Sequence, residues 1–263
     1  MKSYSEQQLR HALAMTEIPA GSLVMVHSSL FSLGRIENCP IPAIPQCHYN
    51  AIRELIGPEG TIVVPTFNFD FCRGRTFDRQ RTPSKAMGSF SEYMRRRSLA
   101  RRSPHPIQSL VAEGPLSGEL TDLDTAGAFE RGGSFDRLID LDAHLLLIGC
   151  GVEPVSLVHW AEERVGVPYR YWKEFRGLYR DQGHESHRTY RMYVRDLTLD
   201  PRVQLRPIGE KLQKRNLLRS FALSCSTLET CRSRDFAEVA ISILRDDPTA
   251  LIQRPQLDSW SPL

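Results

Sequence analysis

The sequence predicts a three-layer α/β/α protein with a central mixed sheet, contained in a single domain over residues 1–263. Short apolar runs that end at Gly or Pro alternate with segments whose apolar residues recur at helical spacing, as in a sheet covered by helices. No internal repeat and no linker divides the chain, and 263 residues suit one α/β domain. Residues 170–235 are a candidate for a smaller lobe on the substrate side.

Helix-capping residues, apolar runs, and Gly or Pro residues that end them define the expected helices and strands in the first half of the chain. Short polar residues precede the helical patterns, as N-caps do, and Gly or Pro follows where most of the patterns stop. The expected elements are a helix capped by Ser5 that reaches about Thr16, a strand over 23–27, a helix over 49–56, a strand over 61–66 and a helix capped by Ser84 that reaches about Arg97.

The second half continues the alternation. The wholly apolar run 145–148 is the clearest buried strand, because it breaks at Gly149. Residues 168–175 are aromatic and charged and are expected to form a pocket wall. The other expected elements are a strand over 106–112, a helix that Ser156 can cap, an exposed antiparallel strand over 187–198 and a closing amphipathic helix capped by Asp235.

Composition excludes several classes of protein. Hydrophobic residues make up 41% and charged residues 25% of the chain, as in ordinary soluble proteins. The apolar runs are too short to cross a membrane and the first residues are too polar for a signal peptide, so we expect a cytoplasmic protein. The six cysteines show no disulfide or zinc spacing, and no metal is expected.

His159 and Glu162 form the first candidate site. They follow the strand over 145–148, on the helix that Ser156 can cap, with His159 as its third residue. A histidine in a first helical turn meets the positive end of the helix dipole, which disfavours its charged form. A carboxylate one turn later can accept a hydrogen bond from the imidazole. The pair predicts a neutral general base; the alternative is a partly exposed helix on which two such residues happen to be neighbours.

The segment His27-Ser28-Ser29-Leu30 is the second candidate site. Because it directly follows a strand, its backbone N–H groups and hydroxyls can face a phosphate. The same segment can hold a serine nucleophile, although it lacks the Gly-x-Ser-x-Gly elbow of hydrolases. A plain capping turn is the third interpretation.

Two further motifs have open interpretations. Pro104 and Pro106 confine His105 to an extended conformation, which suits either a tight loop or a residue that meets a substrate in a fixed pose. Residues 95–102 carry five arginines in eight positions, which predict a solvated helix face or a clamp for a phosphorylated cofactor. No aromatic residues are interleaved with them and the net charge is only +3, so no nucleic-acid partner is expected. Walker and dinucleotide fingerprints are absent.

Five ordered segments together carry more information than any one of them. They are VHSSLFSLG (26–34), GTIVVPTF (60–67), MGSFSEYMR (87–95), RRSPHPIQSLVAEG (101–114) and SLVHWAEERVGVPYR (156–170). Across roughly residues 5–245, they resemble the aminoglycoside 3-N-acetyltransferase family. The resemblance implies a coenzyme-A-dependent N-acyltransferase with a mixed sheet flanked by helices, unlike the GNAT fold.

Position by position, the resemblance implies that His159 is the catalytic base and that Glu162 supports it. His105 belongs to an Arg-Ser-x-His-Pro motif and is expected in the active site as well. The His-Ser-Ser-Leu turn matches the family's cofactor loop and is expected to contact the pantetheine and pyrophosphate of acetyl-CoA or another acyl-CoA. The expected cofactor-binding residues are His27, Ser28, Ser29, Leu30, Thr66, Met87, Gly88 and Ser103.

The chain departs from the family pattern in two places. The segment after the cofactor loop, usually glycine-rich, is NCPIPAIPQC (38–47), which changes the edge of the pocket. The chain is net basic and rich in arginine and tyrosine over 164–195, whereas a polycationic aminoglycoside is drawn to an acidic cleft. We therefore expect a small-molecule amine acceptor that carries phosphate or carboxylate, such as a nucleotide-linked amino sugar.

The leading hypothesis is an acyl-CoA-dependent N-acyltransferase, most simply an N-acetyltransferase, that modifies a primary amine of an amino sugar, aminoglycoside or related metabolite. In it, His159 removes a proton from the attacking nitrogen. The alternatives are a Ser-His-Glu hydrolase with Ser28 or Ser29 as nucleophile and a non-catalytic anion-binding protein. No membrane partner is expected, and the oligomeric state stays open.

Overall fold

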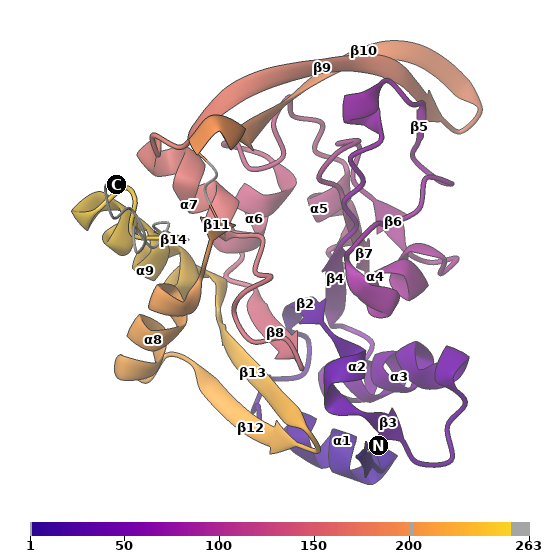
Figure 1. The fold of residues 1–263 in the computed structure, drawn as a ribbon. Coiled ribbons are helices and arrows are strands. Elements are labelled where there is room, and N and C mark those ends of the chain that lie inside the picture. The colour runs from indigo at the N-terminus through magenta and orange to yellow at the C-terminus, as the bar shows by residue number, and fades with distance from the viewer. Residues whose placement is uncertain (1, 200–201, 254–263) are drawn as a thin grey trace, which may run out of the picture.

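The computed structural model describes residues 2–199 and 202–253. Its centre is a seven-stranded mixed sheet with the order β12-β13-β8-β2-β4-β7-β6 (Figure 1). β2 pairs in parallel with β8 and β4, while β13 and β7 add antiparallel strands on either side. The strands are β12 (Arg219–Leu223), β13 (Ser226–Arg232), β8 (His144–Ile148), β2 (Leu23–Ser28), β4 (Thr61–Pro65), β7 (Leu110–Glu113) and β6 (Arg101–Arg102).

Helices cover both faces of this sheet, so the predicted three-layer α/β/α class is confirmed. Alternate residues of β2 point to opposite faces: Val24 and Val26 belong to one buried apolar cluster and Met25 to the other. The first cluster packs against α1 (Glu6–Ala14), α2 (Leu30–Leu33), α3 (Ile44–Ile56) and α4 (Gly88–Arg95). The second packs against α5 (Ser117–Thr121), α6 (Ser134–Asp140), α7 (Val158–Val165), α8 (Arg206–Lys214) and α9 (Ser233–Asp246).

The helix starts show which caps the sequence predicts correctly. Ser5 caps α1 in a capping box, accepting from the Gln8 N–H while the Gln8 side chain accepts from the Ser5 N–H. Three predicted caps are wrong, because α4, α7 and α9 begin at Gly88, Val158 and Ser233 without side-chain caps. The proposed caps were Ser84, Ser156 and Asp235.

A long hairpin leaves the main body after α7. β9 (Arg170–Asp181) and β10 (His184–Arg195) pair antiparallel over their whole length, and β5 (Phe77–Asp78) pairs with the outer part of β9. The hairpin arches over the end of the molecule that carries α6 and α7 (Figure 1). Within the described part of the candidate lobe 170–235, the hairpin extends away from the central sheet, whereas β12 and β13 are strands of that sheet and α8 packs on it.

Short elements complete the described residues. Two-residue strands pair β1 (Ser3–Tyr4) with β3 (Arg35–Ile36), and β11 (Arg202–Val203) with β14 (Ile252–Gln253). The 3₁₀ turns are Ile41–Ala43, Phe71–Arg73 and Leu197–Leu199. None of the helices in residues 2–199 and 202–253 is both long and apolar enough to span a bilayer.

Candidate active site

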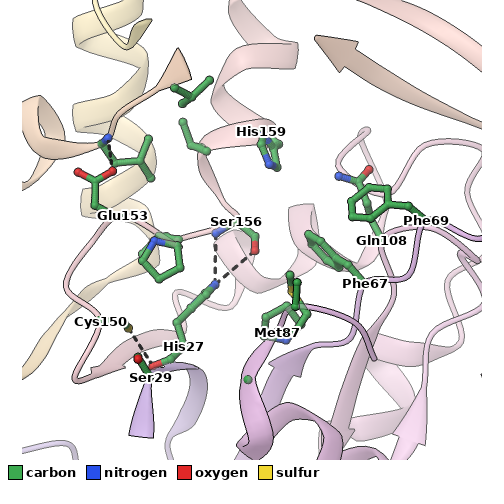
Figure 2. Close-up of a pocket in the computed structure, with 18 of the residues that line it drawn as sticks. His27, Ser29, Phe67, Phe69, Met87, Gln108, Cys150, Glu153, Ser156 and His159 are labelled. Carbon is green, nitrogen blue, oxygen red and sulfur yellow. Dashed lines mark hydrogen bonds between the residues drawn. The ribbon is translucent and has the colours of Figure 1, made fainter. Parts of the chain in front are cut away.

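A cavity of about 800 Å³ lies at the carboxyl ends of β2, β4 and β8 (Figure 2). This is the edge at which open α/β sheets bind ligands, because the loops that follow the parallel strands meet there. The turn after β2, the loop after β8 with the start of α7, and the end of β10 supply most of the lining. Their lining residues include Ser28, Ser29 and Leu30; Glu153, Val155, Ser156 and His159; and Met192, Tyr193, Val194 and Arg195.

Two glycines bring the His-Ser-Ser-Leu turn close to its neighbours. A Cβ on Gly149 would lie 2.7 Å from the Ser29 carbonyl oxygen, and a Cβ on Gly88 would lie 2.9 Å from that of Ser28. Both glycines have positive φ, +68° and +82°. The Ser29 N–H also donates to the Ile148 carbonyl at 2.8 Å. The end of β8 and the start of α4 therefore pack directly on the backbone of the turn.

The start of α4 forms another part of the cavity wall. Met87, Gly88 and Ser89 line the cavity, and no side chain caps the helix. The first N–H groups of a helix have no intrahelical partner and favour anions. This wall of the cavity therefore combines serine hydroxyls with an uncapped helix start.

His27 explains why Ser156 is not a helix cap. The Ser156 N–H donates to His27 Nε2 at 3.2 Å, and the Ser156 hydroxyl lies 3.4 Å from the same nitrogen. Burial lowers the pKa of His27 to about 4, so the ring is neutral at pH 7. His27 therefore joins the loop before α7 to the end of β2 (Figure 2).

His159 and Glu162 are in direct contact, as the sequence predicts. His159 Nδ1 lies 2.7 Å from Glu162 Oε2, and the Tyr169 hydroxyl donates to Glu162 Oε1 at 3.0 Å. Arg170 Nε lies 2.9 Å from Glu162 Oε2, and the Glu162 side chain is fully buried. Arg170 Nη2 also lies 3.2 Å from His159 Nδ1. The carboxylate contact is the shorter of the two and favours a proton on Nδ1, and in the neutral ring this leaves the Nε2 lone pair free.

The surroundings of His159 keep the imidazole neutral. Burial is the main cause that lowers its pKa below 6.5, the Arg170 guanidinium lowers it further, and Glu162 opposes both. The sequence predicted a neutral ring from the helix dipole, whereas in the structure burial is the main cause of the lowered pKa. The His159 ring points from α7 toward the cavity (Figure 2), and 29% of the His159 side chain is exposed. The Phe129 ring packs edge-on against it at 5.4 Å.

Three predicted site residues lie outside the cavity lining. Thr66 is fully buried and its hydroxyl bonds Ser109, while the Ser103 hydroxyl accepts from the Leu110 N–H. His105 is 4% exposed, packs on Tyr190, and its Nδ1 accepts from the Gln108 N–H at 3.0 Å. These three side chains therefore do not line this cavity, and their expected places in the site stay predictions.

The arginine run 95–102 also has structural partners. Arg97 is bound by Glu113 at 2.5 Å and Arg101 by Asp122 at 2.7 Å. Arg102 is buried and donates to the Ser109 hydroxyl and the Thr66 carbonyl. The run neither lines the cavity nor forms a simple solvated face. No cluster of three or more metal-binding side chains occurs among the described residues.

Sequence comparison identifies the family to which this architecture belongs. Residues 25–245 match the family model described as aminoglycoside 3-N-acetyltransferase. The chain belongs to this family. An aminoglycoside N(3)-acetyltransferase III from Salmonella sp is 29% identical over 187 residues, and one from Acinetobacter baumannii is 28% identical over 187 residues. Each match covers 64% of this chain and 64% of the relative, so it spans just under two thirds of the relatives' length.

Solved structures agree with this fold. Aminoglycoside acetyltransferase AAC(3)-Xa has a TM-score of 0.81 at 22% identity, covering 93% of both chains. AAC-IIIb, in a binary complex with CoASH, has a TM-score of 0.80 at 19% identity, covering 93% of this chain and 97% of that one. The predicted fold of the aminoglycoside 3-N-acetyltransferase family is thus confirmed.

Sequence reasoning missed part of the site in this family member. Arg170 and Tyr169, which hold Glu162, lie in the stretch 168–175 that was expected to form a pocket wall. Of these, Arg170 lines the cavity. The contact between Phe129 and His159 could not be predicted from the sequence, because Phe129 lies in a loop thirty residues before His159.

Proposed function

We propose that the chain is a coenzyme-A-dependent N-acyltransferase that transfers an acetyl group to the primary amine of an amino sugar, aminoglycoside or related metabolite. The observation that carries the proposal is His159, in contact with Glu162, at a cavity that the His-Ser-Ser-Leu turn also lines. Membership of a family named for N-acetyl transfer supports it.

The donor substrate, acetyl-CoA, supplies an activated thioester carbonyl. The turn at Ser28, Ser29 and Leu30 and the start of α4 at Gly88 fit such a donor, because hydroxyls and backbone N–H groups suit its phosphates. Apolar side chains such as Phe67 and Met87 line the same cavity and suit the pantetheine arm. These residues would hold the donor, and the acceptor would enter beside His159.

His159 acts as the general base. Its Nε2 takes a proton from the acceptor nitrogen as that nitrogen attacks the thioester carbonyl, while the Nδ1–H stays on the imidazole and remains hydrogen-bonded to Glu162. The C–N bond forms, the C–S bond breaks, and coenzyme A leaves as a thiolate that takes the proton back from the His159 imidazolium to give the free thiol. Glu162 stabilises the imidazolium that forms, while Arg170 and Tyr169 fix the carboxylate. General-base catalysis contributes about 10²–10⁴-fold, and holding both substrates in register supplies the rest.

Turnover with acetyl-CoA tests the proposal. A panel of amines is incubated with the protein and acetyl-CoA while free thiol is titrated and products are identified by mass spectrometry. We expect thiol release that depends on one class of amine, and we expect His159→Ala to lose about 10²-fold or more of kcat. The same variant should bind coenzyme A in calorimetry almost as tightly as the native protein. Near-normal turnover of His159→Ala would refute the assignment of the base.

The hydrolase alternative lacks its nucleophile–base contact. The Ser29 hydroxyl bonds Ser32 at 2.7 Å. No hydrogen bond among the described residues joins a histidine to the Ser28 or Ser29 hydroxyl. Stable labelling of Ser28 or Ser29 by a fluorophosphonate would nevertheless favour the hydrolase over our proposal.

A further inference from the structure

Two cysteines outside the cavity lie in contact with each other. The Cys39 and Cys47 sulfur atoms are 3.3 Å apart, and both residues are partly buried. Cys39 follows β3 and Cys47 lies in the first turn of α3, so the two bracket the segment 40–46. None of residues 38–47 lines the cavity. The chemistry of this pair is therefore independent of the proposed acyl transfer.

The backbone on either side of the pair is fixed to the core. Ile36 and Ile44 are buried in the same apolar cluster, and the Cys39 N–H donates to the Ile36 carbonyl at 3.3 Å. The segment between the cysteines, PIPAIPQ, contains three prolines, each of which restricts its own φ and the residue before it. The short distance between the sulfurs therefore belongs to an ordered loop that has few other conformations.

Neither thiol makes a strong hydrogen bond that would hold the sulfurs apart. Cys39 Sγ lies 3.6 Å from the Pro40 carbonyl oxygen, and Cys47 Sγ lies 3.6 Å from Glu6 Oε1. The sulfurs of a disulfide are about 2.05 Å apart, so these two have to approach by roughly 1.3 Å. Rotation about χ1 moves a cysteine sulfur while the backbone stays in place. The pair can therefore close without the loss of a strong contact.

The surroundings do not suit a metal ion. Both ring nitrogens of His48, which follows Cys47, already have partners: the Ile44 carbonyl oxygen at 2.9 Å and the Tyr4 hydroxyl at 3.1 Å. Within residues 2–199 and 202–253, no three His, Cys, Asp or Glu side chains are placed to hold a metal together. A structural zinc site needs four ligands, so the pair is better suited to oxidation than to metal binding.

We propose that Cys39 and Cys47 are an oxidation site that forms a reversible disulfide in the presence of a low-molecular-weight disulfide such as oxidised glutathione. The Cys39 thiolate attacks oxidised glutathione, which forms a mixed disulfide and releases one glutathione thiolate that takes up a proton. The Cys47 thiolate then attacks the Cys39 sulfur, and the second glutathione leaves in the same way. The two cysteines lose two electrons, and oxidised glutathione is reduced to two thiols.

The order of the two steps follows from the surroundings of Cys47. Burial, the neighbouring Cys39 sulfur and the Glu6 carboxylate raise the pKa of Cys47 to about 12, so little thiolate forms there at pH 7. His48 supplies no positive charge, because burial lowers its pKa to about 4. Glutathione therefore attaches first at Cys39. The short distance between the sulfurs then favours ring closure, since the attack by Cys47 is intramolecular.

Peptide mapping of the whole protein tests the disulfide. The protein is incubated with oxidised glutathione, its free thiols are alkylated, and it is digested with trypsin. The tryptic peptide 36–53 contains Cys39 and Cys47 and no other cysteine. At the end of the reaction, this peptide should lack two hydrogens, carry no glutathione and take up no alkylating reagent. A peptide 36–53 that stays alkylated, or that keeps glutathione, would refute the disulfide.

Serine variants separate the two steps. Cys47→Ser should keep glutathione on Cys39, because the second thiol is missing. Cys72→Ser is the matched control, since Cys72 is also partly buried but hydrogen-bonds no other cysteine among the described residues. This control should form the Cys39–Cys47 bond as the native protein does. Absence of the glutathione adduct on Cys39 in Cys47→Ser would overturn the proposed route.

Thermal unfolding gives a readout that does not depend on mass spectrometry. A cross-link between the two ends of the segment 40–46 restricts the unfolded chain, so oxidation should raise the Tm of the native protein by about 3–5 °C. Dithiothreitol should return the Tm to its starting value, and oxidation of Cys39→Ser should not raise it. A Tm that falls on oxidation, or a rise that persists after dithiothreitol, would contradict a reversible stabilising bond.

Discussion

Replacing Glu162 by Gln separates the positioning of His159 from the stability of the fold. Glu162 is fully buried and takes contacts from His159 Nδ1 (2.7 Å), the Tyr169 hydroxyl (3.0 Å) and Arg170 Nε (2.9 Å). Gln keeps the volume but removes the charge. The His159 tautomer is then no longer fixed and the imidazolium loses its counter-charge, so we expect kcat to fall by about 10²–10⁴-fold.

The same change destabilises the protein through Arg170. Its side chain is only 8% exposed, and without Glu162 it becomes a buried, uncompensated cation. Breaking a buried ion pair in this way costs about 3–5 kcal/mol, a large share of the 5–15 kcal/mol that stabilises a typical domain. Glu162→Gln should therefore lower both kcat and the free energy of unfolding.

A double variant distinguishes the two effects. Glu162→Gln with Arg170→Met removes both charges, so the free energy of unfolding in urea should return to within about 1–2 kcal/mol of the native value. Thiol release from acetyl-CoA should stay as low as in Glu162→Gln. Recovery of kcat in the double variant, or native kcat in Glu162→Gln, would refute the positioning role of Glu162.

Three further predictions concern pH, the cofactor turn and the first helix. Burial lowers the pKa of His159 below 6.5, so the acid limb of kcat/KM, which reports the free enzyme, should have its midpoint below pH 6.5, where the base becomes protonated; a midpoint above 6.5 would contradict this. Gly88→Ala places a Cβ 2.9 Å from the Ser28 carbonyl at positive φ, so calorimetry should show coenzyme A binding weakened by about tenfold or more. Ser5→Ala removes the cap bonded to Gln8 and should lower the free energy of unfolding by about 1 kcal/mol in urea; no change would exclude a stabilising capping box.

Apolar runs and capping residues predicted those strands and helix ends that depend on nearby residues alone. The apolar run 145–148 is β8, the run 23–27 forms most of β2, and the Ser5 cap forms as expected. The predicted cap at Ser156 is wrong because Ser156 contacts a residue far away in the sequence. Its backbone N–H donates to His27 Nε2, and its hydroxyl lies within hydrogen-bond distance of the same nitrogen. A helix start depends on such long-range contacts as well as on the identity of the preceding residue.

The candidate site was predictable in part for the same reason. His159 and Glu162 lie one turn apart on one helix, so their contact follows from spacing alone. Arg170, at the start of β9, and Phe129, thirty residues before His159, contact the pair through tertiary packing, which helical spacing does not predict. His105, expected in the active site from its Arg-Ser-x-His-Pro motif, is buried against Tyr190, and its expected role stays a prediction.

The protonation state of the His159 ring tests the proposed general base directly. In ¹⁵N-histidine-labelled protein, with the signal assigned by its loss in His159→Ala, we expect a neutral ring at pH 7 with the proton on Nδ1. Titration of that signal should give a pKa below 6.5. A proton on Nε2 at pH 7, or a pKa above 6.5, would contradict the proposed general base.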